Sequence, residues 1–125
     1  MTTQEILEAA RGAKTAVALS DSGTRDSALL GMADALCAPE SMDAILAANA
    51  EDMAAAKGRI SDVMLDRLAL TPQRIEAMAK GIRDVAALPD PVGRVLSHIE
   101  RPNGLVIEKT AVPMGVIAII YESCL

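Results

Sequence analysis

The stretch of sequence that decides the fold is Val112–Ser123, which reads V-P-M-G-V-I-A-I-I-Y-E-S. Its residues 116, 117, 119 and 120 are β-branched, and such residues are stiff at χ1 and favour strands. A strand that is apolar on both faces is typical of a parallel sheet covered by helices on both sides. Parallel partner strands require crossovers of roughly a dozen residues or more. Only Cys124 and Leu125 follow Ser123, so we expect the chain to be the front part of a larger α/β protein.

The composition excludes several classes of partner. The 125 residues are 51% hydrophobic, which excludes a disordered chain and fits one domain. There is one Tyr and neither Phe nor Trp, so nucleic-acid bases have no aromatic side chains to stack on. The formal net charge is −5 and the sequence has no Lys/Arg cluster. We therefore expect no nucleic-acid partner and no attraction to an anionic membrane.

The sequence also lacks the signals of a membrane protein or a metalloprotein. It opens with the polar run T-T-Q-E rather than a secretory signal. The longest mostly apolar run, Ala111–Tyr121, is shorter than the ~18 residues that a membrane span needs. Two cysteines and one histidine form neither a metal-ligand spacing nor a disulfide framework. These observations predict a cytoplasmic chain without a metal site.

Most of the chain shows helical periodicity. Helices are predicted over residues 2–19, 24–37, 39–57 and 61–68, and from Thr71 to the residues before Pro89. Thr71-Pro72 is a strong start signal, with Thr71 at the cap and Pro72 at the first helical position. Gly58 is placed to end the third helix in the left-handed conformation. The loop between the first two helices is expected at residues 20–23.

After Gly93 the pattern changes from helical to extended. Arg94–Arg101 and Leu105–Val112 flank Pro102-Asn103-Gly104, and Asn-Gly is a strong hairpin signal. Pro102 disfavours the tightest turn because it removes a backbone donor beside it, so a looser turn is the alternative. An isolated hairpin is marginal in water, so we expect this one to pack on another surface.

No catalytic group can be recognised from the residues alone. Cys37 lies near the end of a helical apolar stripe and is interpreted as a small buried hydrophobe. His98 lies in a hairpin strand and is interpreted as a surface or interface residue. Glu51 and Asp52 are adjacent and do not share a helix face, so both are expected on a solvated face.

Three blocks occur in the order found in one known family. They are I-L-A-A-N-A-E-D-M at Ile45–Met53, L-D-R-L-A-L-T-P-Q-R-I-E-A-M-A-K-G-I-R-D-V-A-A-L-P-D-P-V-G at Leu65–Gly93, and the Val112–Ser123 stretch. Through them the chain resembles the N-terminal region of the gamma-glutamyl phosphate reductases, also called glutamate-5-semialdehyde dehydrogenases, of the aldehyde dehydrogenase superfamily. The resemblance weakens before about Met42.

The resemblance implies a cytoplasmic enzyme of proline biosynthesis. It would reduce L-glutamyl 5-phosphate with NADPH to L-glutamate 5-semialdehyde and release phosphate. In the family a cysteine thiolate attacks the acyl phosphate, and hydride from the cofactor then reduces the thioester. Neither Cys37 nor Cys124 lies in that catalytic context, so no catalytic residue is assigned. The chain alone is therefore expected to be inactive.

The resemblance also implies sites and boundaries. Tyr121, Glu122 and Ser123 match the position at which the first sheet strand leads to the cofactor cleft, so they are cofactor-binding candidates; the alternative is a plain strand-to-helix connection. The implied parts are a helical layer (1–92), a hairpin arm that joins another subunit of a homo-oligomer (93–112), and the first strand of a Rossmann-like parallel sheet (113–125).

Two readings without enzymatic activity remain open. The chain could be an interaction module of helices and a hairpin that assembles with an intact subunit. It could also be a decayed gene fragment, since the family continues with R-P-N where this chain has Cys124-Leu125.

Overall fold

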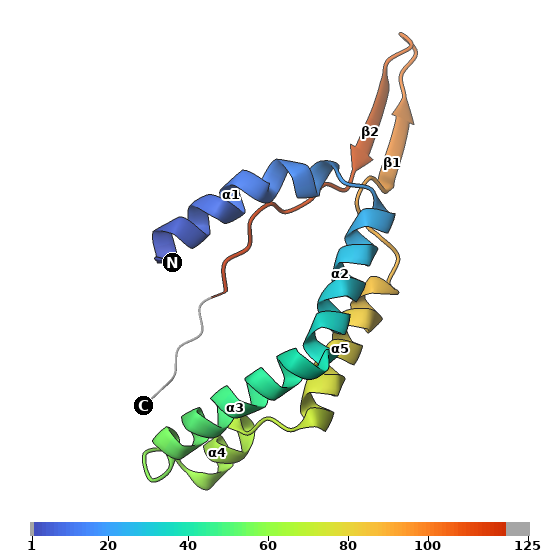
Figure 1. Cartoon of the computed structure of the whole chain (residues 1–125). Coiled ribbons are helices and arrows are strands. Elements are labelled where there is room, and N and C mark those ends of the chain that lie inside the picture. The colour runs from blue at the N-terminus through green and yellow to red at the C-terminus, as the bar shows by residue number, and fades with distance from the viewer. Residues whose placement is uncertain (1, 120–125) are drawn as a thin grey trace. The chain divides into compact units, whose positions relative to one another are not determined.

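The structure is a computed structural model that describes residues 2–119. It is mostly helical with a two-stranded antiparallel hairpin, as the predicted fold class requires (Figure 1). The elements are α1 (Thr3–Leu19), α2 (Ser22–Cys37), α3 (Pro39–Ala56), α4 (Asp62–Leu68), α5 (Pro72–Ala86), β1 (Val95–Glu100) and β2 (Val106–Thr110).

Contacts divide the described residues into two compact units. The helical unit comprises residues 23–88, and the hairpin unit comprises residues 2–22 and 89–119. The predicted division at 92/93 and 112/113 follows the resemblance rather than these contacts, and it stays a prediction.

Local capping chemistry sets most helix ends where the sequence predicts them. The Thr71 hydroxyl accepts a hydrogen bond from the Arg74 amide at 3.2 Å, and Pro72 begins α5. Gly58 follows the end of α3 with φ +79°, a left-handed conformation that glycine adopts without strain. The start of α2 differs from the prediction. It begins at Ser22 rather than Thr24, and the Ser22 hydroxyl donates to the Asp90 carboxylate at 2.5 Å.

All the fully buried side chains among residues 2–119 lie in the helical unit. They are Ala33 of α2 and Ile75 and Ala79 of α5, each 0% exposed. The apolar stripe of α2 is formed by residues 28, 29, 32, 33 and 36 at helical spacing. It is only partly covered, because Met32 is 58% exposed. Periodicity thus identifies the apolar face of this helix but not how much of it has a partner.

The hairpin pairs in a regular register over most of its length. His98 lies opposite Glu108, and Ile99 lies opposite Ile107. The turn is the looser alternative: the Gly104 amide donates to the Arg101 carbonyl at 2.9 Å, and Gly104 has φ +82°. A three-residue loop that ends in a left-handed glycine fits the twist of an antiparallel pair. Every residue of both strands is exposed.

The strand predicted at 116–120 is not present in the described residues. Residues 111–119 have no strand assignment, and Figure 1 shows this segment as an irregular chain beside α1 in the same unit. A strand is held by hydrogen bonds to a neighbouring strand, and the only sheet in the described part of the chain is the hairpin itself. The β-branched run therefore has strand propensity without a partner, and its residue 120 lies outside the described range.

Across residues 2–119, no helix is both long enough and apolar enough to pass through a lipid bilayer.

Candidate functional site

The three cofactor-binding candidates, Tyr121, Glu122 and Ser123, lie outside the described residues. The structure describes the segment that leads toward them. Hairpin pairing continues past β2, because the Ala111 amide donates to the Arg94 carbonyl at 2.9 Å. Beyond this bond the chain leaves the hairpin and runs along α1 (Figure 1).

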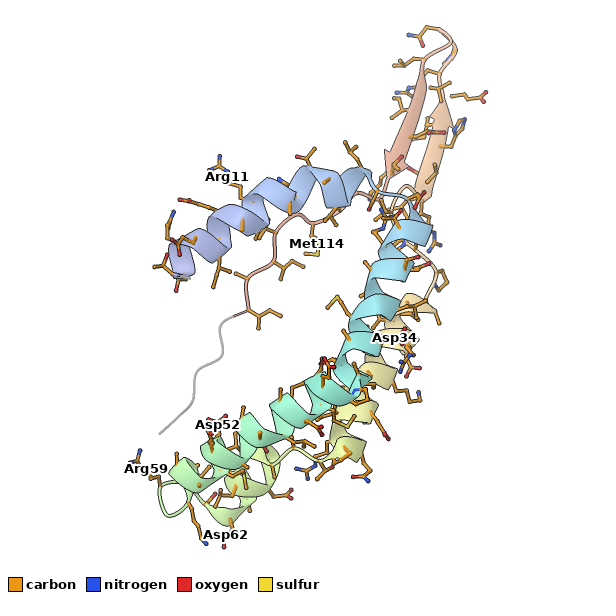
Figure 2. All side chains as sticks on the ribbon, in the orientation of Figure 1. Arg11, Asp34, Asp52, Arg59, Asp62 and Met114 are labelled. Atoms are coloured by element: carbon orange, nitrogen blue, oxygen red, sulfur yellow. The ribbon has the colours of Figure 1, made fainter. Side chains whose placement is uncertain are left out.

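Gly115 is one place where this segment comes near a side chain of α1. Its φ is +99°, which L side chains rarely adopt. A Cβ at this position would lie 3.4 Å from Cε of Lys14. The neighbouring residue Met114, labelled in Figure 2, makes no such approach, because it is 91% exposed. The glycine thus lets the backbone turn beside the lysine, immediately before the β-branched run.

An amide clamp joins α3 to the connection between α4 and α5. Nδ2 of Asn49 donates to the Leu68 carbonyl at 2.9 Å, and its Oδ1 accepts from the Leu70 amide at 2.8 Å. Asn49 is only 9% exposed. Because the side chain satisfies one backbone donor and one acceptor in a poorly solvated place, it fixes the position of that connection.

Arg74 holds the same connection from the side of α5. Its guanidinium donates to the carbonyls of Asp66 and Ala69, the latter at 2.6 Å, and pairs with the Asp66 carboxylate at 3.1 Å. A guanidinium carries five donors in a fixed plane, so one side chain can satisfy several carbonyls at the end of α4. This cluster is structural rather than reactive.

Arg83 of α5 forms an ion pair with Asp34 of α2 at 2.7 Å. The hydrogen bond that Arg83 donates to the Asp34 carboxylate raises the pKa of Arg83, and Cys37 contributes less to the same shift. Cys37 is half-buried, so it is less covered than its interpretation as a small buried hydrophobe requires. It lies at the last residue of α2, where the helix ends and less of its surface is covered.

The other polar residues that the sequence singled out lie on surfaces. Glu51 and Asp52 are exposed on α3, as predicted, and Figure 2 shows Asp52 directed away from the ribbon. His98 is 47% exposed and contacts Glu108 and Glu100. Its prediction as a surface residue is confirmed.

Sequence reasoning missed the clamp and the Arg74 cluster. In the sequence, Asn49 lies at helical spacing from the apolar residues 42, 45, 46 and 53, so the pattern groups it with the apolar stripe of α3. A single amide within an apolar stripe is the signal that could have revealed it, since a buried amide requires partners. Arg74 had no comparable signal in the sequence.

In sequence, the chain is similar to curated gamma-glutamyl phosphate reductases. It is 58% identical over 120 residues to that protein from Streptococcus pneumoniae strain Hungary19A-6, and the match covers 96% of this chain and 28% of the relative. The protein of strain ATCC BAA-255 / R6 matches to the same extent. The chain thus spans about 28% of the length of these relatives. No family model matches it.

The fold is similar to crystal structures of the same enzyme. The gamma-glutamyl phosphate reductase of Thermotoga maritima aligns with a TM-score of 0.82 and 32% identity, over 88% of this chain and 26% of that one. The enzyme of Saccharomyces cerevisiae aligns with a TM-score of 0.77 and 35% identity, over 90% of this chain and 29% of that one. The resemblance to gamma-glutamyl phosphate reductase that the three sequence blocks indicated is therefore confirmed, in sequence and in fold, over nearly the whole chain.

Proposed function

We propose that this chain serves as part of a cytoplasmic, NADPH-dependent reductase of proline biosynthesis. The reaction converts L-glutamyl 5-phosphate, NADPH and a proton to L-glutamate 5-semialdehyde, phosphate and NADP⁺. The observation that supports this most strongly is the 58% identity over 120 residues to curated gamma-glutamyl phosphate reductases.

The proposed contribution of the chain is to position one end of the cofactor site. Tyr121, Glu122 and Ser123 would lie where the strand ends, and ligands of open α/β sheets bind beyond the carboxyl ends of strands. The close approach of Gly115 to Lys14 would fix the start of that strand against α1. The cofactor would supply the hydride, and the nucleophile would come from outside these 125 residues.

A polypeptide of these 125 residues alone is proposed to be inactive. The test is phosphate-dependent reduction of NADP⁺ by glutamate 5-semialdehyde, which is the reaction in reverse. The chain is assayed alone, and co-expressed with the part of the S. pneumoniae relative that the alignment leaves unmatched. Activity is expected only for the co-expressed pair. Turnover by the purified chain alone would refute the proposed inactivity, and a pair that associates without activity would count against the proposed function.

The hairpin is proposed to join subunits of a homo-oligomer. Both strands are exposed, and Ile99 and Ile107 form an opposed apolar pair with 48% and 45% of their surface accessible. Burial of such a pair would favour association.

The matched variants are I99D with I107D, compared with S97D, which introduces a charge in the same strand. Light scattering of the co-expressed protein should show dissociation of the homo-oligomer for the I99D/I107D double variant and little change for S97D. Equal assembly of both variants would remove the hairpin from the interface.

A further inference from the structure

His98 has a carboxylate at each of its two ring nitrogens. Nδ1 lies 2.9 Å from Oε1 of Glu108, its cross-strand partner, and Nε2 lies 3.3 Å from Oε1 of Glu100, two residues along the same strand. The imidazole therefore links β1 to β2 and also ties two positions of β1 together. It is the only histidine of the chain.

The chemistry of these groups determines which form of the ring fits. An ionised carboxylate only accepts hydrogen bonds, and a neutral imidazole has a single N–H. With a neutral ring, one nitrogen would present its lone pair to a carboxylate oxygen. With a doubly protonated ring, both nitrogens donate, and both hydrogen bonds are charge-assisted.

We propose that His98, Glu100 and Glu108 form a proton-dependent clip across the hairpin, which is closed when the imidazole is protonated and loosened when it is neutral. This clip lies outside the candidate cofactor region and has no role in the proposed reaction.

None of the neighbouring cations in the hairpin lies directly opposite His98, so we infer that the protonation of His98 mainly determines whether the clip is closed. Lys109 lies opposite Ser97 rather than opposite His98, and Arg94 and Arg101 lie just beyond the two ends of β1. Every residue of both strands is exposed, and the His98 side chain itself is 47% exposed. Among residues 2–119, no three His, Cys, Asp or Glu side chains are arranged to hold a metal ion, so the cluster is not interpreted as a metal site.

The sign of the pH dependence follows from the protonated form being the one that closes the clip. Hairpin pairing should therefore be stronger at pH 5.5 than at pH 8. If the hairpin joins subunits, which rests on the proposed function, assembly should also be stronger at pH 5.5.

The test is amide hydrogen exchange of the β1 and β2 residues in the full chain at pH 5.5 and pH 8, corrected for intrinsic exchange rates. Wild type should show about two- to fivefold greater protection at pH 5.5, the range expected for exposed charged pairs. H98Q should remove this difference, and so should a double E100Q and E108Q variant. E51Q, an exposed glutamate of α3, should behave as wild type.

A pH difference that is the same in wild type, H98Q and the double variant would overturn the clip. Light scattering at the two pH values separates the clip from the proposed interface. Protection that follows pH while assembly does not would support the clip and reject the hairpin as the subunit contact.

Discussion

Replacing Asn49 with Ala is expected to destabilise the helical unit by about 2 kcal/mol. The change removes two hydrogen bonds, of 2.9 and 2.8 Å, and leaves the Leu68 carbonyl and the Leu70 amide without their partner. An unsatisfied buried polar group costs about 1 to 3 kcal/mol. Leu68 and Leu70 are half-buried, so the lower part of that range applies to each. Alanine also gains about 0.5 kcal/mol in helix propensity over asparagine, which offsets part of the loss.

Urea unfolding followed by circular dichroism at 222 nm measures this change, because the helices supply the signal. With a slope of about 2 kcal/mol per molar urea, a loss of about 2 kcal/mol lowers the midpoint by about 1 M. The matched control is E51A on the same helix, where the side chain is exposed. Its effect should stay within about 0.5 kcal/mol.

Equal midpoints for N49A and E51A would refute the clamp. An unchanged slope is also expected, since both variants expose the same surface on unfolding. A lower slope for N49A alone would indicate that α4 separates before the rest of the unit unfolds. The effect of the substitution would then be local opening rather than a loss of global stability.

Three further predictions follow from other contacts. G115A should weaken the packing of residues 111–119 on α1 by about 1–2 kcal/mol, because φ is +99° there. G12A lies in the middle of α1 with open space around it and should instead stabilise the helix by about 0.5–1 kcal/mol. Amide exchange in α1 measures both effects. R74M should lower the free energy of unfolding by about 1–2 kcal/mol. K80M removes only an exposed ion pair within α5 and should lower it by about 0.5 kcal/mol or less. Equal losses in urea unfolding would contradict the stabilising role of the Arg74 cluster. Backbone and side-chain hydrogen bonds to Thr2 at the cap lower the pKa of Glu5 below its ordinary value of 4.5. The first turn of α1 should therefore stay helical above that pH and fray as pH falls through the lowered value. NMR amide shifts should show this transition in the wild type and not in E5Q.

Elements fixed by local chemistry could be predicted from the sequence. Thr71-Pro72 sets the start of α5, Gly58 ends α3, and Gly104 closes the looser turn. Each of these depends on the φ angle or the capping oxygen of one residue and its nearest neighbours along the chain. Such features need no knowledge of tertiary contacts, so a sequence pattern determines them.

Features that depend on distant partners could not be predicted. Met32 has the correct spacing for the α2 core yet is 58% exposed, because periodicity does not say what covers a face. The amide of Asn49 meets backbone groups 19 and 21 residues away. Residues 116–119 have strand propensity but no neighbouring strand in the described range. The candidates Tyr121, Glu122 and Ser123 depend on the resemblance alone.

We propose that these residues can serve as the corresponding part of a gamma-glutamyl phosphate reductase. The most direct test replaces the matched 120 residues of the S. pneumoniae enzyme with those of this chain. The measurement is kcat/KM for phosphate-dependent reduction of NADP⁺. We expect a value within about tenfold of the parent enzyme, equivalent to about 1.4 kcal/mol of transition-state stabilisation. A chimera that folds and assembles like the parent but has no activity would contradict it.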